Sequence, residues 1–136
     1  MICRRPLALA AWLLIGGAQA LTAQQGAPTP PLASLERGAS GGDAQAQYLL
    51  GLRNHTGQGV LQDFARAAQL FAQAADQGHA GAQAQLGKYL YQGLGGPRDL
   101  DAAMTWFERA AQSGEAQHQF DYAAALEALP GDRADP

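Results

Sequence analysis

The sequence contains few charged residues, one lysine and one cysteine. Charged residues make up 15 % of the 136 positions, and Lys88 is the only lysine among nine basic residues, which face twelve acidic ones. This balance does not favour binding to nucleic acid or to another anionic polymer. The 47 % of hydrophobic residues is too high for a disordered acidic chain, and the 30 alanines favour helices over a β-sandwich. The length predicts one small domain rather than a multidomain enzyme.

Long hydrophobic runs are also missing. The longest, Leu7–Ile15, has nine residues and would extend only about 14 Å as a helix, half of a bilayer core of about 30 Å. Arg4 and Arg5 precede this run and small residues follow it up to Ala20, a pattern typical of a secretory signal peptide that is cleaved before Leu21. We therefore expect a periplasmic or secreted protein without stable membrane insertion after cleavage. An uncleaved anchor or a buried helix is the alternative.

The single cysteine, Cys3, lies inside the predicted signal peptide, residues 1–20. The mature chain would therefore have no thiol and could form no disulfide. Residues 21–31, rich in Ala, Gln, Thr and Pro, are expected to form a disordered spacer, and residues 131–136 a disordered tail.

The rest of the chain repeats itself with a period of 36 residues. Gly42, Gly78 and Gly114 stand at this spacing. The same offset relates Leu50-Gly51 to Leu86-Gly87, Gly57 and Gly59 to Gly93 and Gly95, Asp63 to Asp99, Phe71 to Phe107, and Ala74-Ala75 to Ala110-Ala111. A repeat of this length is typical of a helix–turn–helix array.

Each unit divides into two predicted helices. The first covers about residues 43–54 and 79–91, where apolar and small side chains recur at helical spacing. Paired glycines, which reach positive φ readily, end this helix. Asp63 and Asp99 then stand where a helix needs an N-terminal acceptor, so the second helix is expected to run from there to the glycine that opens the next unit.

Small residues on the first helices and aromatic residues on the second are expected to pack together. The small residues are Ala46, Gly51, Ala82 and Gly87, and the aromatic ones are Phe71, Trp106 and Phe107. Half repeats flank the two units, because residues 32–41 match the end of a second helix and residues 115–129 match a first helix. The expected repeat domain therefore spans residues 32–130.

These positions together resemble the SEL-one-like repeat, which belongs to a tetratricopeptide-like family with units of about this length. In the first unit the motif is carried by Leu50-Gly51, Gly57, Gly59-Val60, Asp63, Ala68, Phe71, Ala74-Ala75 and Gly78. In the second it is carried by Leu86-Gly87, Gly93, Gly95, Pro97, Asp99, Ala103, Trp106-Phe107, Ala110-Ala111 and Gly114. The resemblance implies an all-α fold, a right-handed helix–turn–helix solenoid of two full repeats with half-repeat caps.

The resemblance also implies protein–protein adaptor work and, for exported bacterial members, a role in the cell envelope. We therefore expect a non-catalytic adaptor or scaffold that binds a protein partner. Because such solenoids generally need at least about three units, the alternative is a structural or regulatory subunit that folds fully only with its partner. An envelope enzyme is a third interpretation, for which no set of residues suggests a mechanism.

The predicted binding residues lie toward the ends of the first helices, which line the concave face of helix-pair solenoids. Where the family usually has an apolar pair, this sequence has Arg53 and Asn54. With His55, Tyr89 and Tyr91 they form the predicted partner-binding site, because Tyr and Arg are enriched at binding hot spots. The alternative is that Tyr89 fills the core and Arg53 is a solvated side chain.

A second candidate surface lies in the C-terminal half repeat. Phe120, Tyr122, Leu126 and Leu129 form an apolar stripe without a following helix to cover it. The stripe could bind a partner or form a homodimer, or it could pack entirely onto the preceding helix pair.

Motifs for catalysis or metal binding are missing. His55, His79 and His118 form no H-x-x-x-H or H-E-x-x-H pair, no serine lies in a G-x-S-x-G turn, and the mature chain has no cysteine nucleophile. His79 is expected to be a polar residue in a first helical turn, and His118 to lie on an exposed end cap. We expect no metal, no cofactor and no enzymatic activity.

Overall fold

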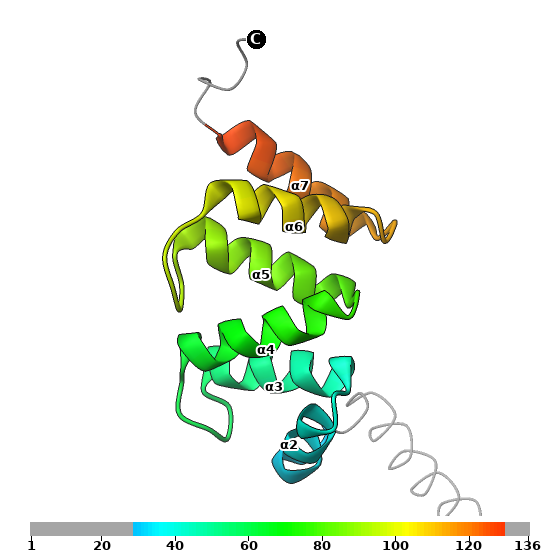
Figure 1. Cartoon of the computed structure of the whole chain (residues 1–136), viewed down its shortest axis with the longest axis vertical. Coiled ribbons are helices and arrows are strands. Elements are labelled where there is room, and N and C mark those ends of the chain that lie inside the picture. Colours follow the sequence, from blue (N-terminus) through cyan, green and yellow to red (C-terminus); the bar gives the residue numbers. More distant parts are fainter. Residues whose placement is uncertain (1–28, 130–136) are drawn as a thin grey trace, which may run out of the picture. The chain divides into compact units, whose positions relative to one another are not determined.

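The computed structural model describes residues 29–129, which form six α-helices and no β-strand. The helices are α2 (Leu32–Ser40), α3 (Ala44–Thr56), α4 (Phe64–Asp76), α5 (Ala80–Gln92), α6 (Leu100–Ala111) and α7 (Ala116–Ala128). Each of them lies against the next in chain order (Figure 1). The predicted signal peptide, most of the predicted spacer and the predicted tail lie outside the described residues.

The helices pair as the 36-residue period predicts. α3 packs most extensively on α4 and α5 on α6, and these pairs are the two full repeats. α4 also packs on α5 and so joins the two repeats, while α2 and α7 are the half repeats at either side. The prediction of an all-α helical repeat solenoid is therefore confirmed.

Polar caps and glycines set the bounds of these helices. Asp63 and Asp99 each accept a hydrogen bond at 3.0 Å from the backbone N–H three residues further on, and so cap α4 and α6 as predicted. Asp43 caps α3 in the same way. Gly57 and Gly93, at φ 75° and 73°, end α3 and α5 in the left-handed conformation.

The two helices of each repeat touch where a glycine faces a phenylalanine ring. A Cβ atom added to Gly51 would lie 2.6 Å from Phe71 Cε1, and one added to Gly87 would lie 3.0 Å from Phe107 Cδ1. Both rings are buried. The contact confirms the predicted close approach of the helices, and the core cluster around it joins α4 to α5 through Ala67, Phe71, Ala74, Ala75, Ala82, Leu86 and Tyr89.

A histidine caps α5 where aspartate caps α3. His79 Nδ1 accepts a hydrogen bond at 3.1 Å from the backbone N–H of Ala82, and His79 Nε2 lies 2.7 Å from Gln45 Oε1. The neutral ring with its hydrogen on Nε2 satisfies both contacts, whereas a proton on Nδ1 would abolish the cap. Burial lowers the pKa of His79 below its ordinary value of 6.5, although the carboxylate of Glu115 opposes this shift. His79 is thus a cap rather than a residue of the first turn.

We expect Gly51→Ala to lower the free energy of unfolding by about 1–2 kcal/mol, because overpacking against Phe71 outweighs the gain in helix propensity of about 1 kcal/mol. Urea unfolding followed by circular dichroism measures this change. The control is Gly96→Ala, since Gly96 has no atom within 4 Å of an added Cβ, and its effect should stay within about 0.5 kcal/mol. Equal stability of the two variants would contradict the contact.

We expect the stability of the protein to fall as the pH drops from 7.5 to 5. Because the pKa of His79 is lowered in the folded chain, the unfolded chain takes up this proton at a higher pH, near its ordinary pKa of 6.5, so protonation favours unfolding. The variant His79→Asn keeps a good cap without a titrating group, so its unfolding free energy at pH 7.5 should stay within about 0.5 kcal/mol of the wild type. Thermal melts at both pH values test this. An acid-induced decrease of the same size in the variant would rule out His79 as its origin.

Candidate functional site

The six residues predicted to bind a partner do not form one surface. They are Arg53, Asn54 and His55 on α3, Tyr89 and Tyr91 on α5, and Tyr122 on α7. Asn54 and Tyr89 are buried, with 4 % and 2 % of their surface exposed. Asn54 Nδ2 donates a hydrogen bond to the Leu50 carbonyl at 2.9 Å, and the Tyr89 ring centre lies 5.3 Å from that of Phe71. Both side chains pack within the core, and their contact with a partner stays a prediction.

The hydroxyl group of Tyr89 contacts another residue of the predicted site. Its oxygen lies 2.7 Å from Nδ1 of the half-buried His55. The Phe64 ring packs against both, with centres 5.6 Å from His55 and 6.2 Å from Tyr89. Burial raises the pKa of Tyr89 from 10.0 to about 12. The three rings link α3, α4 and α5, and this is a structural role.

The other predicted residues are partly accessible. Tyr91 and Tyr122 are half-buried and pack against the C-terminal core cluster of Ala103, Phe107 and Ala125. The Arg98 guanidinium lies 5.5 Å from the centre of the Tyr91 ring, within the range of a cation–π contact. Arg53 is also half-buried. The predicted site is thus reduced to separate, partly exposed positions along α3, α5 and α7.

The predicted C-terminal stripe divides into exposed and half-buried residues. Phe120 and Leu126 are 68 % and 47 % exposed, whereas Tyr122 and Leu129 are half-buried. α7 therefore presents an apolar surface, but a smaller one than the sequence suggested.

His118 is buried, which corrects the prediction of an exposed end cap. Only 9 % of its surface is exposed, and its Nε2 lies 3.2 Å from Glu115 Oε2. Its position corresponds to that of Ala46, which packs so closely on the preceding second helix that a Cβ added to Gly38 would lie 2.8 Å from Ala46 Cβ. α6 is the equivalent neighbour of α7, so a residue at this position is enclosed whatever its polarity.

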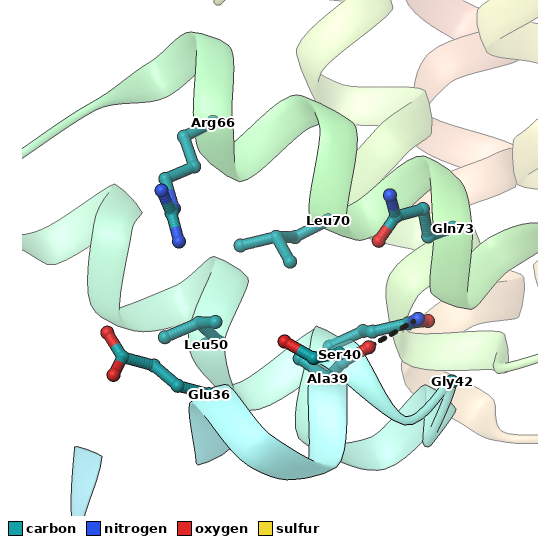
Figure 2. Close-up of a pocket in the computed structure, with 9 residues that line it drawn as sticks. Glu36, Ala39, Ser40, Gly42, Leu50, Arg66, Leu70 and Gln73 are labelled. Atoms are coloured by element: carbon teal, nitrogen blue, oxygen red, sulfur yellow. Dashed lines mark hydrogen bonds between the residues drawn. The ribbon is translucent and has the colours of Figure 1, made fainter. Parts of the chain in front are cut away.

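A groove that the sequence did not predict lies between α2 and α4. We call it the α2–α4 groove. It has a volume of about 600 Å³. Its floor is apolar and its walls are charged: Figure 2 shows Leu50 and Leu70 between Glu36 on α2 and Arg66 on α4. In the described part of the chain, neither of these charged groups takes part in a salt bridge. The remaining lining residues are Ala39, Ser40, Gly42, Gln47 and Gln73.

The α2–α4 groove continues into a second hollow of about 360 Å³ toward the α3–α4 loop. Glu36, Leu50 and Arg66 line both spaces, so the charged pair lies at their junction. Leu61, which is 91 % exposed, lines the far part of this hollow. Together the two spaces form an open channel suited to an extended segment rather than an enclosed site for a small molecule.

Comparison of the two repeats could have revealed the groove from the sequence. Leu70 stands where the next unit has Trp106, and Glu36 corresponds to Ala72. A smaller floor residue and a charged wall residue at equivalent positions are the signals of the groove in the sequence, and they are differences between the repeats rather than matches.

Residues 29–129 contain no cluster of three metal-ligating side chains, and none of their helices has the length and apolar character to cross a membrane. The site consists of open, polar-walled surfaces on a stack of helix pairs. This arrangement defines a helical-repeat protein of the kind that binds along its surface.

The chain belongs to the Sel1 repeat family, whose repeat matches residues 44–79 and 80–115. It is similar to the crystal structure of a Sel1 repeat protein from Oxalobacter formigenes, with 32 % identity, a TM-score of 0.64, and coverage of 66 % of this chain and 68 % of that one. It is also similar to a protective antigen of uropathogenic Escherichia coli with an SLR fold, with 32 % identity and a TM-score of 0.71. That match covers 79 % of this chain but 23 % of the antigen.

A comparison with curated proteins finds no match. Sel1 repeat proteins are generally scaffolds that bind protein partners, and their fold is typically non-catalytic. The family therefore supports the coarse prediction of a protein-interaction module.

We expect Tyr89→Phe to lower the free energy of unfolding by about 1 kcal/mol, because His55 Nδ1 loses its hydrogen-bond partner. Tyrosine absorbance should also lose the component that titrates near pH 12. In the wild type, stability should decrease as the pH rises above 10, since the unfolded chain releases the phenol proton before the folded chain does. The control is Tyr91→Phe, whose hydroxyl forms no hydrogen bond within the described chain. Indistinguishable unfolding and titration curves for the two variants would refute this role.

Proposed function

We propose that the protein is an exported, non-catalytic adaptor of the bacterial cell envelope that binds a protein partner. The observation that carries this proposal is the α2–α4 groove, an open channel with an apolar floor and charged walls on a Sel1 repeat array. Support for export comes from the basic, apolar and small-residue segments that precede Leu21 in the sequence. We place the adaptor in the periplasm or outside the cell.

The partly exposed residues on the first helices are separate, additional contact positions of the same adaptor. Arg53, His55 and Tyr91 are half-buried, so each can bury further surface on binding without leaving its present packing. Residues of this kind give binding energy through packing and directed hydrogen bonds. None of these three side chains lines the α2–α4 groove or the hollow that continues it, so they and the groove would engage different parts of a partner.

A second candidate function is a subunit that assembles through α7. Phe120 and Leu126 are the observation that favours it, because two large exposed apolar side chains on one helix are suited to a homodimer or to a subunit that becomes stable only in a complex.

In-cell crosslinking of the C-terminally tagged full-length chain, followed by mass spectrometry, tests the adaptor. We expect recovery of one envelope protein, with reduced recovery in the double variant Arg53→Ala, Tyr91→Ala. The matched control is Arg109→Ala, an exposed arginine on α6 that is neither one of these contact positions nor a lining residue of the groove. Recovery of the chain alone, lost in Phe120→Ser, would instead support assembly through α7. Recovery of nothing from the envelope or the medium would contradict both functions.

The mature protein is expected to begin at Leu21, because the small-residue segment that ends at Ala20 is suited to signal peptidase. Intact-mass analysis of the protein from the periplasm and the medium measures this. A control variant, Ala18→Arg with Ala20→Arg, should leave the precursor uncleaved. Wild-type protein found only in the cytoplasm with residues 1–20 attached would overturn export.

A further inference from the structure

The α2–α4 groove lies where the next repeat places a tryptophan side chain. A shift of 36 residues takes Leu50 on the groove floor to Leu86, and Leu70 to Trp106. Trp106 is half-buried and packs against the core cluster that contains Leu86. Leu70 is smaller, and the corresponding space between α2 and α4 is open. The second repeat therefore shows which side chain such a space accepts, namely a large aromatic one.

The walls of the two spaces differ as well. Glu36 and Arg66 of the first correspond to Ala72 and Ala102 of the second. Trp106 thus stands beside small apolar residues, of which Ala72 also lines an open hollow of about 380 Å³, whereas the α2–α4 groove is lined by one charge of each sign. Two charges that form no salt bridge within residues 29–129 and lie beside an apolar floor are suited to a ligand that brings its own charged group.

An arginine already covers the aromatic ring in the second repeat. The Arg109 guanidinium lies 4.9 Å from the centre of the Trp106 ring, in a cation–π contact. Figure 2 shows the Arg66 side chain extending toward the space above Leu50 and Leu70. Arg66 is therefore placed to cover a ring inserted there and to bind a neighbouring carboxylate. Glu36 on the opposite wall disfavours a carboxylate on the α2 side, which fixes the direction of the ligand.

We infer that the α2–α4 groove binds a segment of a protein partner that lays an aromatic side chain over Leu50 and Leu70 and places an adjacent carboxylate on Arg66. This inference rests on the proposed interaction function and specifies the chemistry of its partner. The partner segment supplies in trans the ring that Trp106 supplies within the second repeat.

Titration of the isotope-labelled exported protein with the capped dipeptide acetyl-Asp-Trp-amide, followed by NMR amide shifts, tests the inference. We expect saturable shifts at residues of the groove floor and walls. Acetyl-Asp-Ala-amide should bind about ten-fold more weakly or not at all, because the ring provides most of the binding. Acetyl-Lys-Trp-amide should bind about three-fold more weakly, because its charge faces Arg66.

Two variants and a control locate the binding. Leu70→Trp, which copies the second repeat, should fill the groove and abolish saturable shifts while circular dichroism stays helical. Arg66→Ala should remove the preference for Asp over Lys, whereas Arg37→Ala, on α2 but outside the groove lining, should retain it. If Leu70→Trp fails to fold, Ser40→Trp takes its place, since Ser40 lines the same space.

Unchanged peptide binding in folded Leu70→Trp or Ser40→Trp would overturn the inference. Amide shifts confined to residues outside the groove would overturn it as well. Equal binding of the Asp and Lys peptides would overturn the assigned role of Arg66. Failure of the peptide to bind, with partner recovery in cells intact, would exclude this groove and leave the adaptor function standing.

Discussion

The contact between a glycine on the first helix and a phenylalanine ring on the second is the constraint on which this structure depends. It lets the α3–α4 and α5–α6 pairs approach until the ring of Phe71 or Phe107 occupies the place of a missing Cβ. The same Phe71 ring packs edge-on against Tyr89 of the next unit, at 5.3 Å between centres. One side chain thus fixes the spacing within a repeat and the stacking between repeats, and the grooves between second helices follow from that spacing.

The half repeats differ from the full repeats at both members of this contact. Ala123 on α7 stands where the full repeats have Gly51 and Gly87, and Leu35 on α2 stands where they have phenylalanine. A methyl group at position 123 occupies the space that a phenylalanine ring takes in the full repeats. α7 is therefore not shaped to receive a second helix of the same kind, which gives a physical reason for treating Phe120 and Leu126 as a surface of their own.

The sequence predicts the fold well because its strongest signals are local. The capping role of Asp63 and the glycine turns depend on neighbours within a few residues, and the 36-residue period repeats these local signals; the structure confirms all of them. Burial at the candidate site depends instead on the adjoining repeat. Tyr89 is enclosed by α3 and α4, and His118 occupies a position that faces the preceding second helix. Residue type alone carries no information about these neighbours. The predicted binding site, which was chosen by residue type, therefore contains both core and surface residues.

A solenoid whose units touch only their neighbours can change one surface without disturbing the next. The α2–α4 groove is built from α2, α3 and α4 alone. The presence of leucine rather than tryptophan at position 70 therefore affects the first repeat and leaves the core of the second intact. The position equivalent to Trp106 is thus a place where internal packing and external binding compete for the same volume. Leu70 packs in the cluster of Leu35, Ala46 and Leu50 and leaves the volume above it open, so an aromatic side chain of a partner would gain free energy by burying apolar surface there.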